Sequence, residues 1–128
     1  MTLWFYYSRN IVDTARPASY ITGMEPRRAA RCLEKLGNPT RLEMFRLLVQ
    51  AGPDGLAVGE IQEHLGIPGS TLSHHLAHLV NVGLVHQERE GRVLRCRPDF
   101  DLMAQVTGFL TEHCCAGIAA PAASRRAC

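Results

Sequence analysis

Residues 58–82, VGEIQEHLGIPGSTLSHHLAHLVNV, decide the fold of this chain. A short apolar pattern at helical spacing ends at Gly66, and the turn at residues 66–69 leads to a longer helix expected over residues 70–82. The apolar residues of the two helices are Val58, Ile61 and Leu65 in the first and Leu72, Leu76 and Leu79 in the second. A short helix, a glycine-containing turn and a longer helix are typical of a helix-turn-helix.

Two further helices are predicted before this stretch. Pro26 suits the first turn of a helix whose apolar stripe is Ala29, Leu33 and Leu36. Asn38 is a good N-cap for the next helix, which is expected to end at residues 51–53 and to bury one face. The residues of that face are Leu42, Phe45, Leu48 and Val49.

A β-hairpin and a last helix are predicted after it. Residues 84–89 and 92–97 alternate in polarity, and Glu90-Gly91 between them is typical of a hairpin turn. A helix is then expected from about Asp101 to about Gly117. Its inward residues are predicted to be Leu102, Val106, Phe109 and Leu110. The fold class is therefore mainly α, or α+β, with about five helices and one hairpin.

The length of 128 residues fits one hydrophobic core. We divide the chain into an extension (1–23), a domain (24–117) and a flexible tail (118–128); the extension is either disordered or lies across a partner subunit. No apolar run approaches the roughly 20 residues that span a bilayer, so we expect no membrane partner and a cytoplasmic protein. Five cysteines, an odd number, argue against a disulfide scaffold.

The polar face of the second helix of the helix-turn-helix is the predicted DNA-reading surface. Such a helix enters the major groove with its first residues towards the bases, where short polar side chains can form hydrogen bonds. The residues that we expect to contact DNA here are Ser70, Thr71, Ser73, His74 and His78. His75 borders the apolar stripe and is expected to pack rather than read bases.

The hairpin supplies a second predicted DNA contact. The formal net charge is only +2, but Arg89, Arg92, Arg95 and Arg97 concentrate positive charge on the two strands. A basic hairpin beside a recognition helix is a wing that can grip the DNA backbone or minor groove, and we expect Arg89, Arg92 and Arg95 to do so. The alternatives are an arginine-rich edge that prevents strand pairing and a module that binds only protein.

Several motifs in order resemble the ArsR/SmtB family of metal-responsive repressors. They are residues 36–42 (LGNPTRL), 70–79 (STLSHHLAHL), 83–85 (GLV) and 90–92 (EGR). The resemblance covers about residues 25–115 and implies a winged helix, a homodimer through the first and last helices, and binding to operator DNA that an inducer reverses. Pro68-Gly69 departs from the Ser-Gln that the family often carries there.

The resemblance also implies several places for an inducer, of which two lack ligands. The start of the third helix (57–60) has no thiol, and the last helix offers Asp101 and His113 without a second well-placed histidine, so a tetrahedral zinc site is incomplete. Cys114 and Cys115 remain, and some family repressors of arsenicals carry a comparable pair. Soft thiolates suit soft metals and metalloids, so trivalent arsenic, as arsenite or a methyl or aryl arsenical, is the expected inducer.

The number of sulfur ligands is left open. Adjacent cysteines point about 100° apart on a regular helix, so both reach one atom only where the helix end frays. Cys96 is expected to face inward, where it is equally well interpreted as a third ligand of the inducer or as a packing residue. Cys128 and Cys32 are further candidates for the third ligand. A redox sensor or a cadmium, zinc or lead sensor of the same fold is the alternative, whereas an enzyme is disfavoured because no catalytic arrangement is recognisable.

Overall fold

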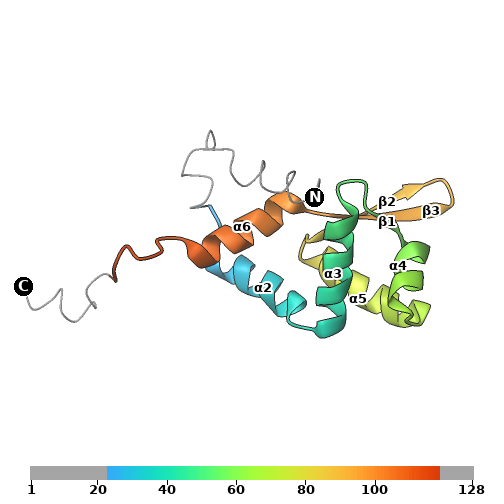
Figure 1. The fold of residues 1–128 in the computed structure, drawn as a ribbon, viewed down its shortest axis with the longest axis horizontal. Coiled ribbons are helices and arrows are strands. Elements are labelled where there is room, and N and C mark those ends of the chain that lie inside the picture. The colour runs from blue at the N-terminus through green and yellow to red at the C-terminus, as the bar shows by residue number, and fades with distance from the viewer. Residues whose placement is uncertain (1–22, 119–128) are drawn as a thin grey trace, which may run out of the picture.

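The computed structural model describes residues 23–118, and the expectations for residues 1–22 and 119–128 lie outside the described part. Five helices and three strands follow one another within it. Their order is α2 (Pro26–Leu36), α3 (Pro39–Ala51), β1 (Leu56–Ala57), α4 (Val58–Leu65), α5 (Gly69–Asn81), β2 (Val85–Glu90), β3 (Val93–Pro98) and α6 (Phe100–Thr111). Helices α2 and α6 lie against each other at one end of the molecule, and the β2–β3 hairpin extends from the other end (Figure 1). Within residues 23–118, none of the helices combines the length and the hydropathy that a membrane span requires.

The helix boundaries follow from local capping. The side chain of Asn38 accepts hydrogen bonds from the backbone N–H groups of Thr40 (3.0 Å) and Arg41 (3.1 Å), which begins α3 as predicted. Asp99 caps α6 in the same way through the N–H of Leu102 at 2.8 Å. Gly66 ends α4 in the left-handed conformation. These caps fix where α3 and α6 begin and where α4 ends.

One core joins all of the helices. The side chains at its centre include Phe45, Leu48, Ile61, Leu72, Leu79, Leu84 and Val85. The buried face predicted for α3 is partly wrong, since Met44 is buried and Leu42 is 44% exposed. Cys32 of α2, expected to flank the apolar stripe, is also fully buried. Leu110 of α6, expected to point inward, is 59% exposed, which leaves an apolar side chain on the outside of that helix.

The sheet has a strand that the sequence did not reveal. Strand β1, two residues long, pairs antiparallel with β3 through Leu56 opposite Cys96, which gives the order β1-β3-β2. Gly55, just before it, has φ +66, and a Cβ there would lie 2.0 Å from the carbonyl oxygen of Cys96. The loop before the helix-turn-helix is therefore tied to the wing by a contact that only glycine permits.

Two element boundaries correct the predictions. Glu90 pairs with Val93, so the hairpin turn is Gly91-Arg92 rather than Glu90-Gly91, with Gly91 in the left-handed region. Helix α6 ends at Thr111 and not near Gly117. Of residues 111–118, all except the half-buried Glu112 are exposed, so no tertiary packing supports more helix there.

Candidate nucleic-acid interface and cysteine site

Helix α5 presents the predicted reading face to solvent. Leu72, Leu76 and Leu79 fix its inner side in the core. Its opposite side carries exposed side chains at the start of the helix, which are Ser70, Thr71, Ser73 and His74, followed by the half-buried His78. The structure therefore exposes four of the five residues that we expect to contact DNA on this helix, at the end that would approach the base edges.

Two of the three histidines of α5, His75 and His78, lie close to cations from neighbouring elements. His75 is half-buried with its Nδ1 3.5 Å from Nη1 of Arg41, in agreement with a packing role. Desolvation lowers the pKa of His75, and the nearby charges of Arg41 and His74 lower it further. The pKa of His78 is also lowered, first by desolvation and then by Lys35, Arg41 and the other two histidines. Protonation of either ring is therefore less favourable than in a free histidine.

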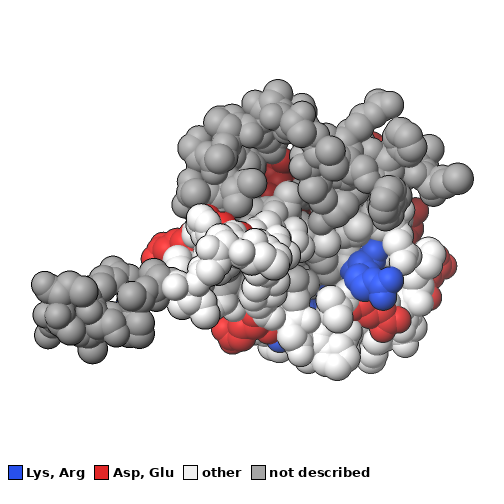
Figure 2. All heavy atoms as spheres, turned by 60° about the vertical axis from the view of Figure 1, so that its left-hand side comes forward, with Lys and Arg blue, Asp and Glu red and all other residues white. Residues whose placement is uncertain are grey.

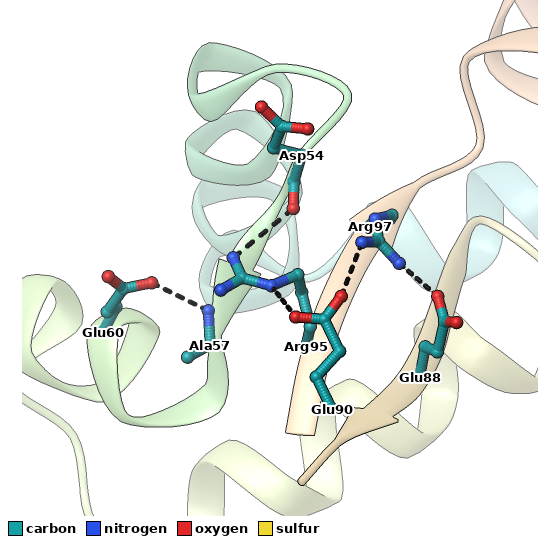
Figure 3. Close-up of polar contacts among 7 residues, drawn as sticks. All are labelled: Asp54, Ala57, Glu60, Glu88, Glu90, Arg95 and Arg97. Atoms are coloured by element: carbon teal, nitrogen blue, oxygen red, sulfur yellow. Dashed lines mark hydrogen bonds and ion pairs between the residues drawn. The ribbon is translucent and has the colours of Figure 1, made fainter. Parts of the chain in front are cut away.

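The wing carries a network of opposite charges on one face. Because paired and alternate residues share a face, Glu88 and Glu90 of β2 lie beside Arg95 and Arg97 of β3 (Figure 3). Glu90 accepts from Arg95 Nε at 2.9 Å and from Arg97 Nη2 at 2.8 Å, and Arg97 also pairs with Glu88. The Nη1 group of Arg95 donates to the carbonyl oxygen of Asp54 at 3.5 Å. These contacts lower the pKa of Glu90 and raise that of Arg97.

The network changes the interpretation of the basic hairpin. Arg95 and Arg97 are engaged with carboxylates of the same strand pair, so they add little net positive charge to the wing. Arg89 and Arg92 are exposed, and neither has an ion pair with another described residue. On the face shown in Figure 2, the visible cluster of Lys and Arg adjoins acidic side chains. The two glutamates were missed as arginine partners, although their alternation on one strand could have revealed them.

The two C-terminal thiols converge just after α6. Sγ of Cys114 lies 3.4 Å from Sγ of Cys115, and both side chains are exposed. The backbone makes this possible because His113 and Cys115 both have positive φ, 58° and 61°. A non-glycine residue rarely adopts that conformation, which costs about 1–3 kcal/mol. Residues strained in this way are found most often at functional sites. The termination of α6, and not fraying of a continuing helix, brings the sulfurs together.

The other described cysteines lie apart from this pair. Cys96 is fully buried in β3, where Gln87 Nε2 is 3.6 Å from its Sγ, and burial raises its pKa. Burial likewise raises the pKa of Cys32. Among residues 23–118 no three Cys, His, Asp or Glu side chains are grouped so as to hold a metal ion. Within the described residues, the structure thus does not group Cys96 with Cys114 and Cys115.

The comparisons with known proteins define the class first. A family model described as a helix-turn-helix domain matches residues 36–88. A solved homodimeric winged helix-turn-helix DNA-binding domain from Mycobacterium bovis, described as "a possible ArsR-family transcriptional regulator", has a TM-score of 0.53 and 28% identity, over 71% of this chain and 90% of that one. The fold and the exposed recognition helix are those of winged-helix DNA-binding regulators.

The relatives in sequence narrow the class to a family. An uncharacterized HTH-type transcriptional regulator of Methanocaldococcus jannaschii is 38% identical over 50% of this chain and 70% of its own length. A "putative arsenical resistance operon repressor" of Halobacterium salinarum is 36% identical over 46% of this chain and 49% of its own. A "probable mercury resistance operon repressor" of Streptomyces lividans is 34% identical over 55% of this chain and 54% of its own length. The chain belongs to the ArsR/SmtB family of winged-helix transcriptional repressors, and it is a DNA-binding regulator rather than an enzyme.

Proposed function

We propose that this repressor binds its operator as a homodimer and releases it when a trivalent arsenical binds Cys114 and Cys115. The observation that carries the proposal is the 3.4 Å separation of two exposed thiols on a backbone held in the left-handed conformation. Two such thiolates are a preformed bidentate ligand for a soft, thiol-seeking centre. The similarity to an arsenical resistance repressor supports the same ligand class.

The separation of the sulfurs favours a pyramidal centre. With bonds of about 2.3 Å, the length of zinc–thiolate bonds, two sulfurs 3.4 Å apart subtend about 95° at the bound atom. That angle is narrower than the tetrahedral angle that zinc prefers, and it suits trivalent arsenic with its lone pair. Because no third thiol of the described residues joins the pair, a methyl or aryl arsenical, which needs two sulfurs, is the inducer that we expect to act best.

The proposed dimer supplies the route from ligand to DNA. Leu33 of α2 is 37% exposed and Leu110 of α6 is 59% exposed, and the two helices lie together at one end of the molecule (Figure 1). A partner that covers these side chains places Cys114 and Cys115 just beyond the interface helix α6. A ligand that fixes residues 112–115 then shifts α6 against its partner. Half-sites one helical turn apart tolerate little misplacement, so a coupling of about 1–3 kcal/mol lowers operator affinity roughly 5- to 150-fold.

Release of a labelled operator fragment, followed by fluorescence anisotropy, tests the proposal. Reduced protein is titrated with phenylarsine oxide, methylarsenite, arsenite, cadmium, zinc and mercury, each beside Cys114→Ser/Cys115→Ser and the control Cys128→Ser. We expect phenylarsine oxide to release DNA from the parent and from Cys128→Ser but not from the double variant. Release of the double variant at the same concentration would contradict the proposal. A response to arsenite that is lost in Cys128→Ser would assign the third sulfur to that residue.

A thiol-based redox switch is the second candidate, because the same contact favours it. Two thiols 3.4 Å apart can be oxidised by hydrogen peroxide to a disulfide, with reduction of the hydrogen peroxide to two molecules of water. Peroxide in the absence of any arsenical is therefore a further arm of the titration. DNA release by peroxide alone, reversed by dithiothreitol, would replace the arsenical proposal with this one.

A further inference from the structure

We propose that His74 and His78 form a second metal site, for a borderline divalent ion such as Zn²⁺, on the DNA-reading face itself. This site differs from the thiol pair both in its position and in the way it would act. It lies on α5, and its occupant would block the operator directly instead of acting through α6.

The geometry of the two rings carries the inference. Nε2 of His74 lies 3.4 Å from Nε2 of His78, one helical turn apart on the same face. Zinc–imidazole bonds are about 2.0–2.1 Å long, so two nitrogens at this separation subtend about 110° at a shared ion. That is the tetrahedral angle. The rings stand nearly perpendicular, with an interplanar angle of 89° and centroids 4.8 Å apart. Without an ion, the same contact is a hydrogen bond between the two rings.

The surroundings keep the pair available as ligands. Metal ions bind through imidazole nitrogen atoms, and the cations near His78 are Lys35 and Arg41. The helix is held by its buried leucines, so the two rings need no backbone movement to chelate an ion. The same cations repel a divalent ion, and solvent must complete the coordination. The site is therefore expected to be weaker than a closed four-ligand site, and reversible.

Occupation would exclude DNA because the exposed His74 lies on the face expected to contact base edges, beside Thr71. An ion with its bound water between His74 and His78 would fill that surface. Metal and operator would then compete for one face of α5.

Direct metal binding is the first test, made on the full chain with Cys114→Ser/Cys115→Ser/Cys128→Ser as the parent, so that no C-terminal thiol competes. Zn²⁺ affinity is measured by competition with a chromophoric chelator. We expect at least about a tenfold loss of affinity in His74→Gln and again in His78→Gln, because each change removes one arm of a chelate. His64→Gln is the matched control: His64 is also exposed on a helix, where its Nδ1 contacts the carbonyl oxygen of Glu60.

Operator competition is the second test and separates metal binding from any direct contact of His74 with DNA. The quantity compared is the fold-change in operator affinity that Zn²⁺ causes within each variant. We expect Zn²⁺ to weaken operator binding by the parent and by His64→Gln, and not by His74→Gln or His78→Gln. Equal zinc affinity in the parent and the His74→Gln and His78→Gln variants, or no zinc binding by the parent, would overturn the inference. The arsenical proposal would be unaffected, since its thiols are absent from this experiment.

Discussion

Gly55 is the residue whose replacement has the clearest expected cost. An alanine there must hold φ near +66 and place a Cβ 2.0 Å from the backbone carbonyl of Cys96. The left-handed conformation costs about 1–2 kcal/mol, and moving the backbone away from the clash adds about 1–3 kcal/mol. We expect Gly55→Ala to lower the free energy of unfolding by this sum in urea denaturation.

Gly91 is the matched control for that change. Its φ of +63 is nearly the same, but nothing lies within 4 Å of a Cβ built on it. Gly91→Ala should therefore show the conformational cost alone. Equal destabilisation by the two substitutions would mean that the contact of Gly55 with β3 does not hold the wing to the loop before α4.

His75 and His78 make stability depend on pH. Their pKa values are lowered in the folded protein, so the unfolded chain binds protons more readily. The free energy of unfolding is highest above the histidine pKa of the unfolded chain, which is about 6.5. It decreases as the pH falls from there through the lower pKa values of the folded protein. We expect urea unfolding at pH 5.5 to need less denaturant than at pH 7.5. The difference should shrink in His75→Gln and persist in His64→Gln.

Individual cysteines show where sequence reasoning reaches its limit. The alternation of β3 correctly placed Cys96 inward, because side-chain direction in a strand follows from local geometry. Whether Cys96 approaches Cys114 depends on the distance between elements, which no local pattern contains. The convergence of Cys114 and Cys115 likewise depends on two residues with positive φ, which ordinary propensities do not predict.

At the scale of elements, the wing gives a prediction about salt dependence. Arg92 lies in the exposed hairpin turn without a described ion pair, whereas Arg95 is bound to Glu90. If each arginine that contacts a phosphate releases counterions, Arg92→Ala should reduce the slope of log affinity against log salt by about 1. Arg95→Ala should change that slope less. The reverse order, measured by operator titration at several salt concentrations, would show that the Glu90–Arg95 pair opens on DNA.

The elements that begin and end with strong local signals are the ones the sequence predicts well. Asn38 marks the start of α3 and Gly66 marks the end of α4, because capping depends on local chemistry. Strand β1 has no such signal, since two residues have no period and pair only because the fold brings β3 beside them. The end of α6 was predicted six residues too late, because the apolar pattern does not show where packing stops.

At the scale of the whole molecule, the proposed dimer is testable without DNA. Leu110→Asp places a charge on the exposed apolar side of α6, which the partner subunit would cover. We expect the variant to sediment as a monomer at concentrations where the parent is a dimer, and to lose operator affinity. Leu42→Asp, at an exposed leucine of α3, should leave the mass unchanged. A monomeric parent, or a monomeric Leu42→Asp variant, would contradict a dimer through α2 and α6.

The early end of α6 has a consequence for how such a regulator can diversify. Residues 113–118 are exposed and contribute nothing to the buried core, while the helix-turn-helix and the wing share that core with α2, α3 and the first turns of α6. Thiols in this segment can be gained, lost or exchanged at little cost to folding. If the inducer binds these thiols, as proposed, substitutions in residues 113–118 can change which inducer is bound without disturbing the part that reads the operator.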